Sequence, residues 1–189
     1  METVRERRRL QTREEILAAA WTAAREDGLA RLSLRDLARR VGMRAPSLYS
    51  YFPSKEAIYD AMFAYGQQEF ADQVAETPRT GSPRDVFRRA AHSFFDFCVK
   101  DPVRYLLLFQ RTIPEFEPSP ESYRLAEQNL GKFAQFMKDC GVTDPRAIDM
   151  WTAMLTGLVS QQLSNDPGGD RWARLLDDLV DLYCDHIGL

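Results

Sequence analysis

The sequence predicts an all-α protein. Two observations indicate this class: apolar residues recur at helical intervals of three and four along most of the 189 residues, and the stretches with this spacing are separated by short segments rich in Pro, Gly and Asp. No strand-like alternation and no internal repeat competes with the helical pattern. Apolar residues make up 44% of the chain, which is enough for the core of one large domain or two small ones.

The first expected helix begins at Thr12 and ends at Gly28. Thr12 and Glu15 have the spacing of a capping box, in which each side chain bonds to the backbone of the other residue. Apolar residues at helical spacing then mark its buried side, namely Ile16, Leu17, Ala20, Trp21 and Ala24.

The second expected helix begins at Ser33. Ser33 and Asp36 again have the spacing of a capping box. Its buried stripe is formed by Leu34, Leu37, Ala38 and Val41. Gly42 ends this helix, because glycine lacks a Cβ and adopts the left-handed geometry that a sharp turn needs.

A third, short helix is expected after this turn, with Pro46 in its first turn. Leu48 and Phe52 lie four residues apart and are expected to face a small core. The opposite side carries no acid and consists of Ser47, Tyr49, Ser50 and Tyr51. Two short helices joined at a glycine are the arrangement that lays one helix in the DNA major groove, so this stretch indicates a helix-turn-helix motif.

The N-terminal segments resemble the TetR family of bacterial repressors. The resemblance lies in Ile16, Leu17, Ala19, Ala20, Gly28, Ser33, Leu37, Ala38, Gly42 and the run SLYSYFPSKE at 47–56. It implies an N-terminal three-helix helix-turn-helix DNA-binding domain at residues 1–55 and an all-helical effector-binding and dimerisation domain at residues 56–189. It also implies a repressor that binds a palindromic operator in double-stranded DNA as a homodimer.

By the same resemblance, the third helix reads the groove, Tyr49 and Tyr51 press on the DNA backbone, and Lys55 holds a phosphate. Residues 44–46 depart from the family pattern, which leaves the operator sequence open. Arg44 either pairs bidentately with guanine or contacts a phosphate. The expected DNA-binding residues are Ser33, Arg44, Ala45, Ser47, Tyr49, Ser50, Tyr51 and Lys55.

The charge distribution agrees with a DNA-binding N-terminus. Residues 1–55 hold 12 Lys and Arg against 7 Asp and Glu, a net charge of +5. The rest of the chain has a net charge of −8, which gives −3 for the whole protein. A basic end attracts phosphates, whereas an acidic body does not. A basic arm is expected before the first helix, and it either reaches a minor groove or flanking phosphates or is an ordinary solvated charge run; it contains Arg5, Arg7, Arg8 and Arg9.

Beyond the motif, helices alternate with loops. One long helix is expected from Ser54 to about Glu76, where it would act as a lever between the reading helix and the body. The further helices are expected near 84–100, 102–112, 121–139, 146–164 and 171–187.

The last two helices are apolar over more than one face, which indicates cover on two sides. They are expected either to pair with their copies in a second subunit as a four-helix interface or to be buried within one subunit. The expected interface residues are Trp151, Leu155, Leu158, Val159, Leu176, Leu179, Val180 and Tyr183.

The body also carries a heavy aromatic load. These residues either line a cavity for a small, apolar effector or simply pack in the core. The expected pocket residues are Phe94, Phe97, Cys98, Tyr105, Phe109, Phe133, Met137, Met154 and Gln161, and the polar groups that could orient a ligand are Gln110, Gln161, Gln162 and His92.

Enzymatic chemistry has little support in the sequence. The chain has two histidines, neither at metal-ligand spacing from a cysteine or carboxylate, and no phosphate-binding glycine loop or nucleophile motif. We therefore expect no enzyme activity, no cofactor and no metal site. The acidic residues of the last helix are expected to form a solvated face rather than an acid/base pair; they are Asp177, Asp178, Asp181 and Asp185.

The three cysteines, Cys98, Cys140 and Cys184, are expected to be reduced core thiols. No apolar run approaches the ~20 residues of a membrane span, and the arginine-rich N-terminus does not resemble a signal peptide. We therefore expect a cytoplasmic protein with no membrane partner. A helical small-molecule sensor or enzyme body that does not bind an operator remains the alternative.

Overall fold

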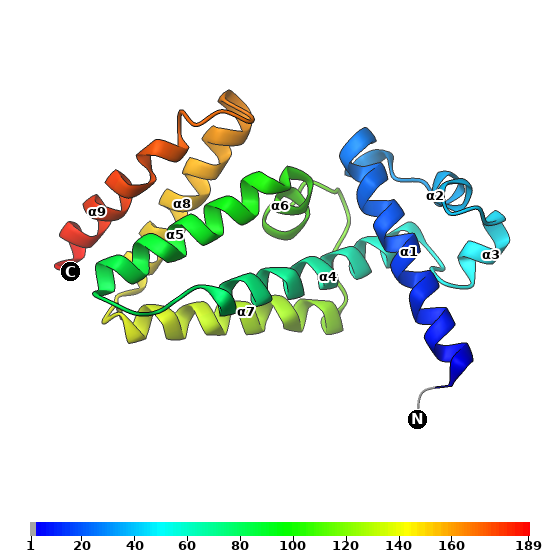
Figure 1. Cartoon of the computed structure of the whole chain (residues 1–189), viewed down its shortest axis with the longest axis horizontal. Helices are drawn as coiled ribbons and strands as arrows, with labels where there is room; N and C mark the ends of the chain where they lie inside the picture. Colours follow the sequence, from blue (N-terminus) through cyan, green and yellow to red (C-terminus); the bar gives the residue numbers. More distant parts are fainter. Residues whose placement is uncertain (1–2) are drawn as a thin grey trace. The chain divides into compact units, whose positions relative to one another are not determined.

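The computed structural model describes residues 3–189, and residues 1 and 2 lie outside the described part. Between residues 3 and 189 the chain forms nine α-helices and two short 3₁₀ helices, with no strand (Figure 1). The predicted all-α class is confirmed.

The helices follow the expected order with shifted ends. In chain order, they are α1 (Val4–Asp27), η1 (Leu29–Arg31), α2 (Leu34–Arg40), α3 (Ala45–Tyr49), α4 (Lys55–Glu76), α5 (Pro83–Lys100), α6 (Pro102–Phe109), α7 (Pro120–Asp139), α8 (Pro145–Asn165), η2 (Ala173–Leu175) and α9 (Leu176–Ile187).

The chain folds into two compact units. The first unit contains residues 1–66 and 106–125, and the second contains residues 67–105 and 126–189. Because α4, α6 and α7 each contribute residues to both units, neither unit is one continuous stretch of chain. The domain boundary expected after residue 55 remains a prediction.

Helix α1 begins earlier than expected. Its capping box is formed by Thr3 and Glu6, so the prediction of a box at Thr12 is wrong. Thr12 lies inside the helix, where its hydroxyl donates to the carbonyl of Arg8 at 3.0 Å. The four N-terminal arginines consequently lie on two turns of α1 and do not form an arm.

Helix α2 starts after Ser33, but the Ser33 side chain makes no capping hydrogen bond. The predicted reciprocal box is wrong, because the Asp36 carboxylate accepts hydrogen bonds from Arg39 and Arg40 instead. These bonds lower the pKa of Asp36 below its ordinary value, Arg40 contributing the larger effect. The turn that follows places Gly42 at a φ of 68°, the left-handed geometry predicted for it.

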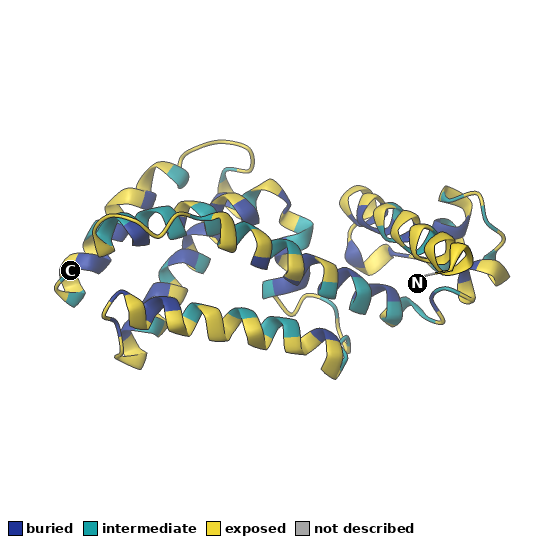
Figure 2. Ribbon diagram, turned by 60° about the horizontal axis from the view of Figure 1, so that its bottom comes forward, coloured by how far each residue is buried: buried dark blue, intermediate teal, exposed yellow. Residues whose placement is uncertain are grey.

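The core of the second unit forms around Phe87 of α5, which is fully buried. Its ring centroid lies 4.8 Å from that of Trp151 in α8 and 5.5 Å from that of Tyr183 in α9. The Tyr183 hydroxyl donates to the carbonyl of Ala147 at 3.0 Å, so this buried polar group is satisfied. The long helices accordingly carry buried residues on one side and exposed residues on the other (Figure 2).

Seven of the eight expected interface residues are inside this core. Their side chains are at most 5% exposed within a single chain; they are Trp151, Leu155, Leu158, Val159, Leu176, Val180 and Tyr183. They pack in the core of a single chain, which is the alternative that the sequence left open, and their part in a subunit interface remains a prediction. Leu179 alone of the set is half-buried.

The outer faces of α8 and α9 carry other apolar and small residues. Met150 of α8 is 39% exposed, Leu182 of α9 is 65% exposed, and Leu175, the last residue of η2 directly before α9, is 38% exposed. Ala153 and Gly157 lie on the same outer side of α8. A partner surface on these helices would therefore use a different face from the one that apolar periodicity indicated.

A ladder of opposite charges joins α5 to α9. Residue numbers rise along α5 while those of the partners fall along α9, since the pairs are Arg84 with Asp185, Arg88 with Asp181 and His92 with Asp177. The Arg88 and Asp181 atoms lie 2.7 Å apart, and the His92 and Asp177 atoms 2.8 Å apart. These three carboxylates remain solvated as predicted, with side chains 43–70% exposed, but each is also paired with a cation of α5, which the sequence did not indicate. Asp178 is exposed, as expected.

Candidate DNA-binding surface

Helix α3 presents a polar outer face from a buried anchor. Arg44 precedes the helix as its N-cap residue, and Pro46 occupies the first turn, where its missing amide proton costs nothing. Leu48 and Phe52 are 0% and 1% exposed, which confirms that they face the core. The side chains between them therefore point outward, and Tyr49 is 50% exposed.

The predicted DNA-binding residues fall into two groups by exposure. Five side chains are exposed: Ser33, Arg44, Ser47, Tyr49 and Ser50. Three are half-buried: Ala45, Tyr51 and Lys55. The packing of α2 against α3 brings the start of α2 and the whole of α3 into one helix-turn-helix, whereas Lys55 opens α4.

Two arginines of α1 hold the end of α3. Arg13 donates to the carbonyl of Tyr51 at 2.8 Å, and its guanidinium lies 4.3 Å from the centre of the Phe52 ring. Arg9 donates to the carbonyl of Ser50 at 3.3 Å. Sequence reasoning missed Arg13 and treated Arg9 as part of a free arm. Arg9 and Arg13 are four residues apart, so their spacing could have indicated that they lie on the same face of one helix.

Lys55 has an intramolecular partner. Its ammonium donates to the carbonyl of Ala30 in η1 at 2.7 Å and lies 5.3 Å from the centre of the Tyr59 ring. An ammonium carries three donors, so further bonds remain possible for it. The phosphate contact expected of Lys55 remains a prediction.

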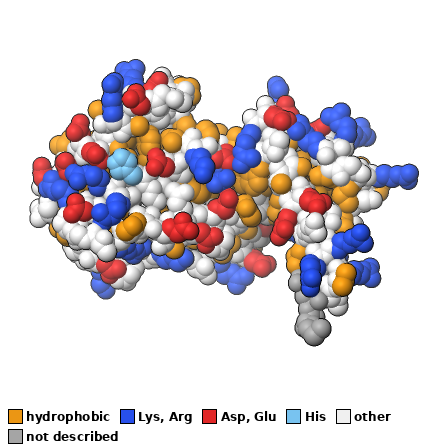
Figure 3. Space-filling model, in the orientation of Figure 1, with side chains coloured by type: hydrophobic (Ala, Val, Ile, Leu, Met, Phe, Trp, Pro, Cys, Tyr) orange, Lys and Arg blue, Asp and Glu red, His pale blue; other side chains and the backbone are white. Residues whose placement is uncertain are grey.

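The first unit carries Lys and Arg side chains along the outer edge of α1 to α3, at the right of Figure 3. Arg40 is neutralised by Asp36, Glu26 and Asp27. Arg35 and Arg44 are exposed. Residues 37–55, which include the whole of α3, contain no Asp or Glu. The positive field on this surface therefore comes from arginines outside the Arg40 cluster.

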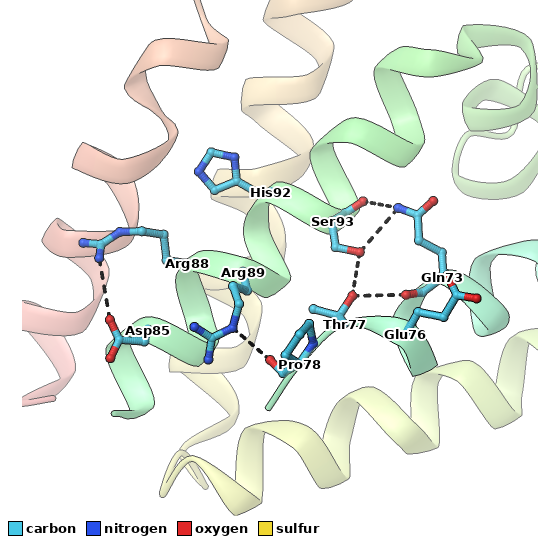
Figure 4. A pocket seen from close by; sticks show the side chains of 9 residues that line it. All are labelled: Gln73, Glu76, Thr77, Pro78, Asp85, Arg88, Arg89, His92 and Ser93. Atoms are coloured by element: carbon cyan, nitrogen blue, oxygen red, sulfur yellow. Dashed lines mark hydrogen bonds and ion pairs between the residues drawn. The ribbon is translucent and has the colours of Figure 1, made fainter. Parts of the chain in front are cut away.

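The second unit contains an open pocket of about 490 Å³ at the end of α4 and along α5, lined mainly by polar and charged residue types (Figure 4). Gln73, Thr77 and Ser93 point toward one another there, with the Thr77 and Ser93 hydroxyls 2.9 Å apart. Arg89 donates to the carbonyl of Pro78 at 2.9 Å. Among the expected ligand-orienting groups, His92 lines this pocket, but none of the nine expected pocket residues does.

Those nine residues differ in burial. Phe97, Cys98, Tyr105 and Met137 are buried, Phe94, Phe109, Phe133 and Met154 are half-buried, and Gln161 is exposed. Phe94 and Phe97 both pack on Phe70, with ring centroids 6.0 and 5.1 Å from it. Packing accounts for these contacts, and an apolar effector pocket remains a prediction.

The three thiols are free and buried. Burial raises the pKa of Cys98, Cys140 and Cys184 above the ordinary value for a thiol, which disfavours the reactive thiolate. Across residues 3–189 no cluster of His, Cys, Asp or Glu is arranged to hold a metal ion. In the same part of the chain, no helix combines the length and apolarity needed to cross a membrane.

The family model described as "Bacterial regulatory proteins, tetR family" matches residues 16–62. This stretch covers α1 from its first buried residue, the whole helix-turn-helix and the first turns of α4. The match therefore falls on the surface just described.

Three curated relatives are regulators. The chain is 34% identical over 84 residues to the transcriptional regulator EthR of Mycobacterium tuberculosis, covering 43% of this chain and 39% of EthR. It is 30% identical over 99 residues to the transcriptional activator FasR of Mycolicibacterium smegmatis, covering 52% and 45%. It is 28% identical over 94 residues to YobS of Bacillus subtilis, covering 50% and 49%. The chain thus matches about half or less of each relative.

Solved structures share the fold along nearly the whole chain. A tetR-family transcriptional regulator from Streptomyces coelicolor has a TM-score of 0.74 at 20% identity, covering 94% of this chain and 81% of its own. The regulator FadR from Bacillus subtilis, solved in complex with stearoyl-CoA, has a TM-score of 0.65 at 15% identity, covering 90% and 96%. Both of these structures are of transcriptional regulators.

Proposed function

Since this chain belongs to the TetR family of bacterial regulatory proteins, we propose that it regulates transcription by binding double-stranded DNA through α2 and α3. The observation that carries the proposal is the outer face of α3, which is exposed, free of acids and anchored from behind by Leu48 and Phe52. A major groove admits one α-helix, and phosphates on both sides favour a surface without carboxylates.

Each side chain on this surface has a proposed role. Ser47 and Ser50 reach base edges, and Tyr49 and Tyr51 press against the DNA backbone. Arg44, at the mouth of α3, pairs with guanine or a phosphate. The helical arginines before Thr12 would contact flanking phosphates, because they follow one another on the exposed start of α1.

We further propose a repressor that acts as a homodimer on a palindromic operator. Two reading heads about 34 Å apart would match successive half-sites of a duplex. The outer faces of α8 and α9 are the proposed contact, since Met150, Leu175 and Leu182 leave apolar surface uncovered in one chain.

The proposed effector is a small, apolar molecule bound in the helical body. Support comes from the aromatic cluster of Phe70, Phe94 and Phe97, and from the acyl ligand in the structure of FadR. Such a ligand must bind the DNA-free arrangement more tightly than the DNA-bound one. A coupling of ~1–3 kcal/mol would lower operator affinity ~5–150-fold.

Selection of bound sites from random duplex DNA tests the proposal directly. We expect enrichment of a two-fold symmetric sequence, and a changed base preference for Ser47→Ala and Arg44→Ala. Glu127→Gln, an exposed α7 change with no proposed role, serves as the control and should select the same sequence. Absence of any preferred duplex at low salt would instead favour a helical small-molecule sensor.

A further inference from the structure

Two glutamines of the second unit are equally buried but differ in their partners. Gln67 of α4 and Gln162 of α8 are each 3% exposed. The side-chain nitrogen of Gln162 donates to two backbone carbonyls, and its oxygen accepts from two backbone amides, all between residues 166 and 173. Gln162 therefore has no N–H left for a ligand, because an amide group carries only two.

Gln67 is bonded at one end of its side chain only. Its side-chain oxygen accepts from the amide nitrogen of Asn129 in α7 at 2.9 Å, and the same nitrogen donates to the backbone carbonyl of Gln67 at 2.9 Å. A backbone carbonyl can only accept, so it fixes the orientation of the Asn129 amide. The Asn129 nitrogen in turn fixes which end of the Gln67 side chain is oxygen.

The side-chain nitrogen of Gln67 has no partner within the chain. No group between residues 3 and 189 accepts a hydrogen bond from it. The fully enclosed unpartnered atoms of this part of the chain do not include it, so a small molecule can touch the nitrogen. An unpaired buried N–H costs free energy, and native proteins pair such groups with protein, water or ligand. This nitrogen is thus a donor for a bound molecule.

Aromatic side chains lie one turn along from this amide on both helices. Phe70 follows Gln67 by three residues and packs on two rings of α5, with centroids 6.0 and 5.1 Å away. Phe133, which is half-buried, follows Asn129 by four residues on α7. All four residues belong to the second unit. Ligand sites combine an apolar lining with a few oriented polar groups, and these residues supply both.

We propose that Gln67 selects the effector of the helical body by donating to a carbonyl oxygen of the ligand. The ligand class is an uncharged, largely apolar ketone, ester or amide. A neutral donor suits a neutral acceptor, and neither Gln67 nor Asn129 offers the opposite charge that a buried ion would need. The effector role rests on the proposed function, whereas binding of a carbonyl compound at Gln67 does not.

Two matched substitutions test whether the chain itself needs the Gln67 amide. We expect Gln67→Met to leave the melting temperature within about 2 °C of the parent protein or to raise it, because it removes a buried donor without a partner. Gln162→Met should lower it by about 4 °C or more, because four backbone groups lose a bond. An equal loss in both variants would overturn the proposal, since the Gln67 amide would then be structural.

Acetophenone and ethylbenzene test the ligand class, because they have the same shape and differ in one carbonyl oxygen. We expect Gln67→Met to lower the ratio of acetophenone to ethylbenzene affinity about fivefold in calorimetric titration, the effect of one net hydrogen bond. Gln128→Met, a change of an exposed glutamine on α7, is the matched control and should keep the parent ratio.

Nuclear magnetic resonance gives a readout that stability does not move. The side-chain amide resonances of Gln67, identified by their loss in Gln67→Met, should shift with acetophenone and stay in place with ethylbenzene. An unchanged affinity ratio in Gln67→Met would overturn the proposal. Failure of acetophenone to bind at its solubility limit would do the same, as would resonances that respond to neither probe and report contact with water alone.

Duplex binding separates the carbonyl site from the proposed function. If acetophenone binds at Gln67 but the parent protein binds no duplex, the site holds and the DNA-binding function fails. If the parent protein binds an operator and the affinity ratio does not respond to Gln67→Met, the ligand class alone fails.

Discussion

The interactions of Arg13 explain how a five-residue helix is aimed. Helix α3 is too short to be stable without tertiary support, and its last carbonyls need partners. The guanidinium of Arg13 binds the Tyr51 carbonyl and covers the Phe52 ring. It therefore fixes the segment that directly follows α3 and carries Tyr51.

Replacing Arg13 should affect specificity more than general affinity. We expect Arg13→Lys to keep its charge but lose the planar fork, so that the ratio of operator to random-duplex affinity falls while random-duplex affinity is kept. Arg5→Ala should lower random-duplex affinity and keep the ratio of operator to random-duplex affinity, because Arg5 is an exposed cation on the same helix. Titration of both variants against operator and random duplexes measures this. An unchanged ratio in Arg13→Lys would remove the aiming role.

The proposed phosphate contact of Lys55 predicts a salt effect. Lys55→Ala should weaken binding to all duplexes alike and make the slope of log K against log salt shallower by about one unit. Loss of the bond to Ala30 adds a structural contribution, which is independent of salt. Lys132→Ala, an exposed cation of α7, should leave the slope unchanged. An unaltered slope in Lys55→Ala would assign the residue to the Ala30 contact only.

At the scale of elements, α8 has apolar residues on both a buried and an exposed face. Leu155 is 5% exposed and packs in the core, whereas Met150 on the outer face is 39% exposed. Helical periodicity identifies both as apolar, but only the neighbouring helices decide which side is inside.

Leucine-to-alanine substitutions should distinguish the buried face from the exposed face by their effect on stability. We expect Leu155→Ala to lower the free energy of unfolding by about 2–5 kcal/mol, because it leaves a cavity in a packed core. Leu182 of α9 is 65% exposed. Leu182→Ala should therefore lower the free energy of unfolding by less than about 1 kcal/mol at concentrations where the chain is monomeric. Urea denaturation monitored by tryptophan fluorescence measures both. Equal losses would contradict the assignment of faces.

The charge ladder between α5 and α9 should contribute little stability. The side chains of Arg88 and Asp181 are 33% and 43% exposed, so solvent screens their attraction. We expect Arg88→Ala to lower the free energy of unfolding by about 1 kcal/mol or less, and 1 M salt to reduce the difference. The exchanged pair, Arg88→Asp with Asp181→Arg, should recover part of any loss. Failure of the exchange to exceed Arg88→Asp alone would mean that the pair has no specific geometry.

For the whole molecule, the division of charge separates two chemistries. The net +5 of residues 1–55 lies with the helix-turn-helix, and the net −8 lies with the remaining chain. Phosphates are attracted to the first part and repelled from the second, which orients a duplex before any specific contact forms. Over one face of the second unit, acidic and basic side chains are intermixed (Figure 3).

Dimerisation can be tested with two leucines of nearly equal exposure. Leu182 of α9 is 65% exposed, and Leu130 of α7 is 66% exposed. We expect Leu182→Glu to shift the protein toward monomer in sedimentation equilibrium, because a charge would be buried in the proposed contact. Leu130→Glu should leave the association unchanged. A monomeric parent protein, or equal effects of both changes, would reject this interface.

Local sequence predicted the helices, the turn at Gly42 and the buried anchors Leu48 and Phe52, because periodicity and turn chemistry act over a few residues. The family resemblance rested on a motif within one continuous stretch of the chain. Local sequence failed where a side chain chooses between near and distant partners. Asp36 has the spacing of a cap yet binds arginines, and the acids of α9 meet cations of α5 from about 90 residues earlier in the chain.

Only the tertiary structure decided which apolar face of α8 and α9 is inside and which groups hold the end of α3. Each of these depends on contacts between segments tens of residues apart. No spacing rule along one helix carries that information, because the energy of burial depends on what the rest of the chain places opposite.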